Sequence, residues 1–143
     1  SREILRNSFS GSQMQEQKLK KLKVQSPDDR LLDKVMKVIN DNLGNPDLNV
    51  EMIATEVGIS RVHLHRKLKE LTNQSTRDLI RNVRLKQAAS LLANQYHNIT
   101  EVATLTGFTN IAYFSTAFKE LYGVPPTTYM EEQQKPSSDE IKQ

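Results

Sequence analysis

The 143-residue chain contains no cysteine. This absence excludes disulfide scaffolds, zinc sites built on thiolates and cysteine nucleophiles, and it suits a reducing compartment. We therefore expect a cytoplasmic location. Chains of this length normally sustain a hydrophobic core without disulfide or metal cross-links.

Long apolar runs are also missing. The stretch from Ala88 to Leu92 is interrupted by Ser90, whereas a membrane-spanning helix needs about 20 apolar residues. No secretory signal pattern is found at the start of the sequence. No stretch alternates apolar and polar residues with a period of two, so we expect no β-strands. These absences leave a small helical domain as the expected class.

Charge is unevenly distributed along the chain, whose net charge is +3. Residues 26–60 contain three basic and seven acidic side chains, a net charge of −4. Residues 61–86 contain eight basic and two acidic side chains, a net charge of +6, and hold most of the potential for binding a polyanion. A solvated helix face would have the same composition, so this interpretation needs support from a motif.

Apolar residues recur at helical spacing between two polar tails, residues 1–25 and 131–143, which predicts an all-α fold of about seven helices. Ser26 and Pro27 are typical of a helix cap and a first helical position. A linking helix is expected over residues 76–94, with an inner face of Leu79, Ile80, Val83, Ala88, Leu91 and Leu92.

An internal repeat is the most informative feature of the sequence. Residues 49–60 (NVEMIATEVGIS) match residues 98–109 (NITEVATLTGFT) at a constant offset of 49. One extra residue then enters the second copy, so the Lys-Glu-Leu of residues 69–71 recurs at residues 119–121, an offset of 50. Two matches in register are a much stronger signal than one.

Each copy has the parts of a helix-turn-helix unit. An asparagine caps a short helix, a small alanine lets two helices approach, and a glycine (Gly58, Gly107) permits the turn because a left-handed backbone costs it little. A Ser or Thr cap (Ser60, Thr109) then starts the second helix. The predicted organisation in chain order is a tail (1–25), a first helix-turn-helix subdomain (26–75), the linking helix (76–94), a second subdomain (95–130) and a disordered tail (131–143).

The sequence resembles the C-terminal DNA-binding domain of AraC/XylS-family transcription factors over about residues 48–129. Three blocks carry the resemblance: NVEMIATEVGISRVHLHRKLKEL, IRNVRLKQAASLL and ITEVATLTGFTNIAYFSTAFKELYGVPPTTY. The order GF, YFS, FK, YG, P and Y in the third block is its most specific part. The resemblance implies a bacterial transcription factor that binds double-stranded promoter DNA sequence-specifically.

Two further segments, SPDDRLLDKV and SRVHLHRKLKELTNQS, are similar to the version fused behind receiver domains in hybrid two-component regulators. SREILRNSF is similar to the tail that joins a receiver domain to such a module. The resemblance implies a fragment of a longer regulator, of the hybrid histidine kinase or response regulator type, that controls nutrient utilisation genes. Its expected partners are upstream receiver and sensor kinase domains, with room for dimerisation in the full-length protein. Tethering of that parent to the inner membrane is compatible with a cytoplasmic module.

In a helix-turn-helix unit the second helix lies in the major groove of DNA. For the first unit this helix is expected over residues 61–71, and its inward side chains are Leu64, Leu68 and Leu71. The outward candidates for base reading are Arg61, Val62, His65 and Arg66. The resemblance places the last three at base contacts, and Arg66 is the strongest because a guanidinium can bind guanine through two hydrogen bonds. The alternative is that Arg66 contacts only a phosphate.

For the second unit the corresponding helix is expected from about Asn110 to Tyr122. Its inward side chains are Tyr113, Phe114, Ala117, Phe118 and Leu121. The candidates for base reading are Asn110, Ile111, Ala112, Ser115 and Thr116. None of them is Arg or Lys, which departs from family members that have an Arg here. We therefore expect an asymmetric DNA site that is read mainly by the first unit, with apolar and hydroxyl contacts as the second unit's contribution.

Phosphate contacts are expected from basic side chains near these helices and from two capped helix N-termini, whose free N–H groups suit anions. These residues are Asn49, Lys69, Arg77, Arg81, Arg84, Asn98 and Lys119. The linking helix, at ~1.5 Å per residue, would span roughly 27 Å. That length suits two recognition helices about one duplex turn, ~34 Å, apart.

Other functions find less support. His63 and His65 are two positions apart and point to different sides of a helix, which does not suit a metal site, and no cofactor is expected. No nucleophile elbow or glycine-rich loop indicates an enzyme. The competing hypothesis is a helical module that binds protein without reading DNA. The basic block argues against it, although the near-neutral second unit leaves room for a partner such as RNA polymerase.

Overall fold

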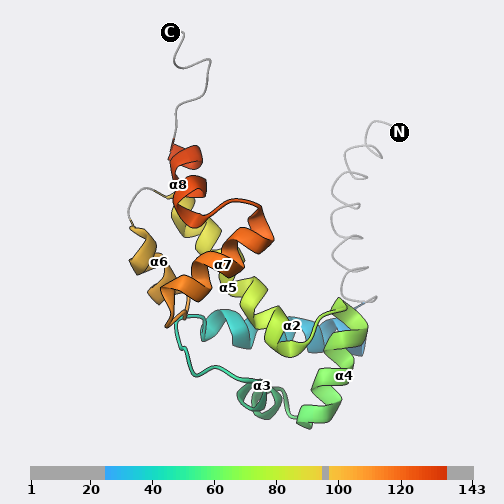
Figure 1. Cartoon of the computed structure of the whole chain (residues 1–143). Helices are drawn as coiled ribbons and strands as arrows, with labels where there is room; N and C mark the ends of the chain where they lie inside the picture. Colours follow the sequence, from blue (N-terminus) through green and yellow to red (C-terminus); the bar gives the residue numbers. More distant parts are fainter. Residues whose placement is uncertain (1–24, 95–96, 135–143) are drawn as a thin grey trace, which may run out of the picture.

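The computed structural model describes residues 25–94 and 97–134, and within them it contains seven α-helices and no strand (Figure 1). The all-α prediction is therefore confirmed. In chain order the helices are α2 (Pro27–Asp41), α3 (Val50–Val57), α4 (Arg61–Thr72), α5 (Thr76–Ala93), α6 (Ile99–Leu105), α7 (Ile111–Tyr122) and α8 (Pro126–Gln134).

Side-chain caps define where the helices start. The Ser26 hydroxyl accepts a hydrogen bond from Asp29 N, and the Asp29 carboxylate accepts one from Ser26 N, which completes a capping box ahead of α2. Asn49 caps α3 as the sequence predicts. In the second unit the cap of α7 is Asn110 rather than the expected Thr109, because the extra residue of the second copy moves the helix start by one position.

Both turns of the repeat place their glycine in the same backbone conformation. Gly58 and Gly107 have φ values of +80° and +88°, in the left-handed region that favours glycine. The N–H that follows each glycine donates to the alanine carbonyl five residues earlier, from Ile59 to Ala54 at 3.1 Å and from Phe108 to Ala103 at 2.9 Å. The repeated sequence thus produces a repeated turn.

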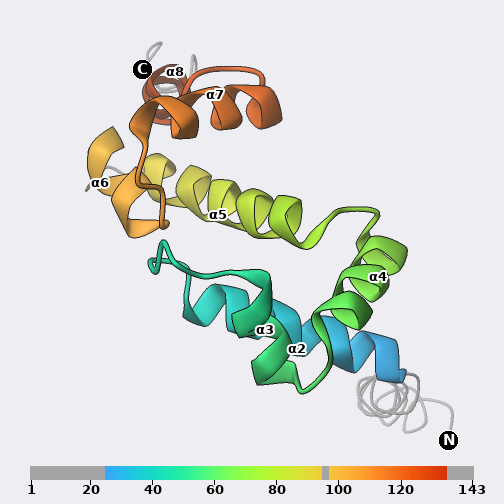
Figure 2. The same ribbon diagram turned by 60° about the horizontal axis from the view of Figure 1, so that its bottom comes forward.

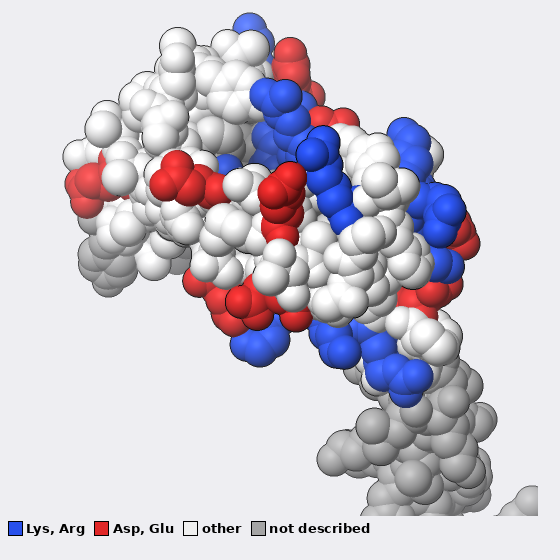
Figure 3. Space-filling view, turned by 90° about the horizontal axis from the view of Figure 1, so that it is seen from below, with Lys and Arg blue, Asp and Glu red and all other residues white. Residues whose placement is uncertain are grey.

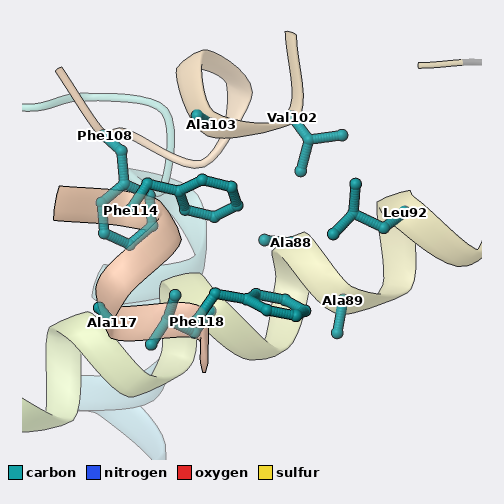
Figure 4. Close-up of a cluster of buried hydrophobic side chains, with 10 residues drawn as sticks. Ala88, Ala89, Leu92, Val102, Ala103, Phe108, Phe114, Ala117 and Phe118 are labelled. Atoms are coloured by element: carbon teal, nitrogen blue, oxygen red, sulfur yellow. The ribbon is translucent and has the colours of Figure 1, made fainter. Parts of the chain in front are cut away.

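The helices form two hydrophobic clusters that share no residue, and helix α5 runs between them (Figure 2). The cluster of the first unit consists of Val35, Ile39, Leu48, Ile53, Ala54, Leu64, Leu68, Leu79 and Ile80. The cluster of the second unit, most of which is drawn in Figure 4, consists of Leu85, Ala88, Ala89, Leu92, Val102, Ala103, Phe108, Phe114, Ala117 and Phe118. Helix α5 therefore gives its first half to one unit and its second half to the other.

Some of the expected inner faces differ from the observed ones. On α5, the expected Val83 and Leu91 are only half-buried, whereas Leu85 and Ala89 are buried although they were not expected to be. The reason is that this helix serves two clusters on different sides. On α7, Tyr113 and Leu121 were expected to face inward but are 48% and 47% exposed. Tyr113 is one residue, about 100° of rotation, from the buried Phe114. Leu121 lies in the last turn, where Tyr122 packs instead, with its ring centroid 4.6 Å from that of Phe118.

Helix α8 changes the expected start of the C-terminal tail. It extends to Gln134, so residues 131–134 are helical although their polar composition predicted disorder. Tyr129 and Met130 pack against the second cluster, and this packing supports a helix that its own residues would not. Residues 1–24 and 135–143 of the expected tails lie outside the described residues.

Candidate nucleic-acid interface

Helix α4 carries the base-reading candidates of the first unit. It starts after Ser60, whose Oγ accepts a 3.1 Å hydrogen bond from His63 N. Leu64 and Leu68 are fully buried, which fixes the rotation of the helix about its axis. The outward side chains are consequently exposed, namely Arg61, Val62, His65, Arg66 and Lys69. Val62 is 75% exposed, so this apolar side chain is available to a binding partner.

A groove of about 430 Å³ lies between this face of α4 and the start of α5. We call it the α4 groove, and it is lined by Val50, Arg61, Val62, His65, Arg66, Ser75, Thr76 and Arg77. Within residues 25–94 and 97–134, neither Arg66 nor Arg77 is within ion-pair distance of a carboxylate. Both guanidinium groups are therefore available to an external anion or a base edge.

Arg61 differs from its neighbours because it has an internal partner. Its guanidinium lies 3.4 Å from the Glu51 carboxylate, and both side chains are largely exposed. Exposed pairs of this kind contribute only about 0–1 kcal/mol, so the contact can exchange for a DNA phosphate at little cost.

Helix α7 presents a face of different chemistry. Asn110, Ile111, Ala112 and Thr116 are exposed, while Ser115 is half-buried. Asn110 Oδ1 accepts a 2.9 Å hydrogen bond from Tyr113 N and is therefore engaged as the cap of the helix. The exposed face near the start of α7 thus carries no formal charge, in contrast to that of α4.

The expected phosphate contacts are spread over both units. Lys69 and Lys119 are exposed near the ends of α4 and α7, at equivalent positions of the repeat. Arg77 is exposed, and Arg81 lies 3.5 Å from Asp78. Asn49 and Asn98 use their Oδ1 atoms to cap α3 and α6, accepting hydrogen bonds from Met52 N at 2.9 Å and Glu101 N at 2.8 Å.

A second groove, also of about 430 Å³, is lined by residues of both units. We call it the central groove. Its walls come from α5, from the loop before α3 and from the turn before α7, and it is lined by Pro46, Leu48, Asn49, Val50, Arg77, Ile80, Arg81, Arg84, Gly107, Phe108, Thr109, Asn110 and Tyr113. Sequence reasoning missed Tyr113 as a member of this surface. Its aromatic type favoured the core, but the repeat contained a contrary signal. At the offset of 50, Tyr113 pairs with the polar His63, whereas Phe114 pairs with the buried Leu64.

Arg84 stands apart from the other expected phosphate contacts. Its Nη2 donates a 2.7 Å hydrogen bond to the carbonyl of Asn45. Burial lowers the pKa of its guanidinium, which remains a cation at neutral pH. Arg84 therefore contacts the protein backbone, whereas Arg77 on the same helix is exposed.

The surface charge differs between the two units in the same way as the exposed faces of α4 and α7 do. Figure 3 shows Lys and Arg side chains over the centre and the right of one face, toward the side where α4 lies in Figure 1. The left part of this face, toward α6, is mostly uncharged and carries acidic side chains. The basic surface thus belongs mainly to the first unit and to α5.

The described part of the chain lacks two other kinds of feature. No three His, Cys, Asp or Glu side chains gather closely enough there to hold a metal ion. None of the described helices has the length and apolarity needed to cross a membrane.

Comparison with known proteins agrees with this architecture. A family model described as a helix-turn-helix domain matches residues 53–132. The chain is 31% identical over 118 residues to an HTH-type transcriptional regulator encoded in the cgkA 5′ region of Pseudoalteromonas carrageenovora, covering 82% of this chain and 68% of that protein. The solved C-terminal domain of AraT, a response regulator from Geobacillus stearothermophilus, is 30% identical with a TM-score of 0.68, covering 80% of this chain and 92% of that one.

A third relative is much longer than this chain. Histidine kinase P4 of Formosa agariphila is 35% identical over 106 residues, which cover 74% of this chain but only 8% of that protein.

Two helix-turn-helix units on one linking helix, with basic side chains exposed on the second helix of the first unit, define a DNA-binding module of transcription regulators. The chain belongs to the AraC-type helix-turn-helix family of DNA-binding domains. The family assignment and the fold indicate regulation of transcription rather than catalysis.

Proposed function

We propose that this domain binds double-stranded promoter DNA sequence-specifically, with α4 and α7 in two successive major-groove segments, as the output domain of a two-component-type regulator. The observation that carries the proposal is the α4 groove. Its lining includes the guanidinium groups of Arg66 and Arg77, which have no carboxylate partner within residues 25–94 and 97–134, together with the imidazole of His65 and the exposed Val62. Two buried leucines fix the rotation of α4 beside it.

The first unit is the main reader in this proposal. Arg66 and His65 reach base edges from α4, and Val62 contacts a thymine methyl group. A bidentate contact from Arg66 to guanine would discriminate against other bases by about 1–3 kcal/mol. Arg61 either contacts a base edge as well or exchanges its Glu51 partner for a phosphate.

The second unit contributes less to base recognition. Ile111 and Ala112 are exposed and can meet thymine methyl groups, and Thr116 offers a hydroxyl. Asn110 retains its amide N–H groups for a base or phosphate, and Ser115, which is half-buried, is the least accessible of the five candidates. The proposed DNA site is accordingly asymmetric.

Phosphate contacts position the domain on the duplex. In the proposal they come from Lys69, Arg77, Arg81 and Lys119 and from the helix N-termini at Asn49 and Asn98. The central groove lies between the two recognition helices, so the DNA backbone between the two major-groove segments would pass along it. Arg84 leaves this set because it contacts Asn45.

A selection from randomised duplexes, followed by binding of the selected sequence at 50–200 mM salt, tests the proposal. DNA binding predicts that the affinity falls steeply with salt as counterions are released, and that Arg66→Ala weakens it. Arg30→Ala is a matched control, because Arg30 is an exposed arginine on α2 and lines neither groove. Enrichment of no sequence, or an affinity that does not change with salt, would contradict the proposal.

The two-component role rests on the relatives. One of them is a histidine kinase and another is the C-terminal domain of a response regulator. In the proposed parent protein a sensor kinase phosphorylates a receiver domain on Asp, and this event changes the dimerisation or the release of the DNA-binding domain. Equal DNA affinities of the phosphorylated and unphosphorylated full-length protein would contradict this role.

A protein-binding module is the second candidate. The uncharged face of α7 and the exposed Leu121 favour a protein partner such as RNA polymerase for the second unit. This candidate predicts that Leu121→Ala lowers transcription activation but leaves DNA affinity unchanged. A loss of DNA affinity in that variant would count against it.

A further inference from the structure

Besides their connection through helix α5, the two helix-turn-helix units contact each other where the loop before α3 approaches the turn before α7. Gly107 lies at this approach, and a Cβ added there would collide with the carbonyl oxygen of Leu43. A Cβ added at Gly44 would stand 3.2 Å from the carbonyl oxygen of Leu105. Each unit thus places a glycine against a backbone carbonyl of the other, which allows a closer contact than any side chain would permit.

Arg84 closes this contact from helix α5. Its Nη2 binds the Asn45 carbonyl, 39 residues earlier in the chain, at 2.7 Å. Its guanidinium also lies over Gly107, where an added Cβ would be 2.8 Å from Nε and 3.0 Å from Cζ. One side chain therefore binds the loop of the first unit through a hydrogen bond and packs against the turn of the second. Hydrogen bonds from a charged donor are stronger than those between neutral groups, which suits a side chain that connects two units.

The contact of Arg84 with the loop at Asn45 and the turn at Gly107 affects DNA binding because the two hydrophobic clusters are separate. Helix α5 connects the clusters, and bending or twisting of this helix would change the relative orientation of α4 and α7. A contact at a distance from the helix axis resists both motions. Rigid linkage of two binding elements raises the effective concentration of the second once the first is bound.

We propose that Arg84 is a positioning residue, which together with Gly44 and Gly107 locks the two units in the orientation that lets α4 and α7 engage one duplex together. This inference rests on the proposed DNA-binding function, although the locked orientation is itself measurable without DNA.

The first experiment measures the orientation directly. Because the chain has no cysteine, Glu70→Cys and Glu120→Cys introduce two spin labels at exposed, equivalent positions of the repeat. We expect a single narrow distance distribution in the otherwise unchanged protein and a broad one in Arg84→Met. Lys86→Met is the matched control, because it removes one positive charge from an exposed position of the same helix. Equal distributions with and without Arg84 would overturn the proposal.

Two milder variants keep the proposal testable if Arg84→Met does not fold. Arg84→Lys keeps the charge and one hydrogen bond but loses the planar group over Gly107, so we expect intermediate broadening. Gly44→Ala requires the Leu105 carbonyl to move by only a few tenths of an ångström, and we expect it to broaden the distribution slightly. Narrow distributions in both variants would overturn the proposal as well.

The second experiment compares two duplexes, one covering only the segment contacted by α4 and the other covering both segments. We expect Arg84→Met to bind the short duplex within about twofold of the unchanged protein and the long duplex about tenfold more weakly. Equal losses on both would identify Arg84 as a phosphate contact and overturn the positioning role. If the unchanged protein bound neither duplex, the proposed function would fail, while the spin-label distances would still decide the role of Arg84.

Discussion

The ammonium group of Lys67 lies 3.2 Å from the carboxylate of Asp28, and this pair joins helix α4 to the first turn of α2. Lys67 also lies 3.8 Å from Glu70, and its side chain is only 26% exposed. Lys69, two residues further along the same helix, is exposed. Two lysines of one basic segment therefore have different surroundings.

This difference predicts the outcome of two matched substitutions. Lys69→Ala removes a proposed phosphate contact, so the slope of log affinity against log salt should decrease by about 0.9. Lys67→Ala removes a contact within the protein and should leave the slope nearly unchanged. Fluorescence anisotropy with a labelled duplex at several salt concentrations measures both slopes. A larger change for Lys67→Ala would contradict the assignment.

The two glycines of the repeated turn should differ in their tolerance of alanine. Both have a positive φ, which costs a side chain about 1–2 kcal/mol. At Gly58 an added Cβ meets no atom within 4 Å, whereas at Gly107 it collides with the Leu43 carbonyl. Gly107→Ala should therefore lower the free energy of unfolding more than Gly58→Ala, as measured by urea denaturation. Equal losses of unfolding free energy would show that the Leu43 carbonyl can move away from an added Cβ at little cost.

Helix α7 offers a test of its observed rotation. Phe118 is fully buried among aromatic neighbours, and replacing it by alanine should cost about 3–5 kcal/mol of stability. Leu121, on the same helix, is 47% exposed, and its replacement by alanine should change stability by about 0.5 kcal/mol or less. Thermal or urea unfolding compares the two. A large loss for Leu121→Ala would restore the inward orientation that the sequence predicted.

Tyr122 should make stability sensitive to alkaline pH. Burial and the neighbouring Tyr129 raise the pKa of Tyr122 above its ordinary value of 10.0. The unfolded chain therefore loses this proton at a lower pH than the folded chain, and stability falls as the pH rises above about 10. Urea unfolding at pH 7 and pH 11 should show a larger loss for the unchanged protein than for Tyr122→Phe. Equal losses would exclude a contribution from this hydroxyl.

The internal repeat predicted much of the architecture because it encodes local backbone requirements. A cap such as Asn49 and a turn glycine such as Gly58 act within a few residues, so their positions in the sequence determine where α3 starts and ends. The starts of α4 and α5 follow from capping residues of the same kind, Ser60 and Ser75. Helical spacing also placed Leu64 and Leu68 inward and Arg66 outward on α4, as the structure has them.

Contacts between distant segments could not be predicted in this way. Arg77, Arg81 and Arg84 are spaced by four and three residues and share one side of α5, and all three were expected to contact phosphate. Spacing along a helix does not tell which segment covers its surface, and here the loop at Asn45 covers Arg84 but not Arg77. The exposure of Tyr113 is a different case, because it follows from the rotation of about 100° that separates Tyr113 from the buried Phe114.

The measurement that tests the central claim most directly is a base-swap titration of the selected DNA site, with the unchanged protein and Arg66→Ala. We predict that replacing one guanine in the segment contacted by α4 costs about 1–3 kcal/mol of binding free energy, and that Arg66→Ala abolishes this discrimination. Swaps in the segment contacted by α7 should cost clearly less and should be unaffected by Arg66→Ala. Equal losses in both segments, or discrimination that survives in Arg66→Ala, would contradict an asymmetric site read by the first unit.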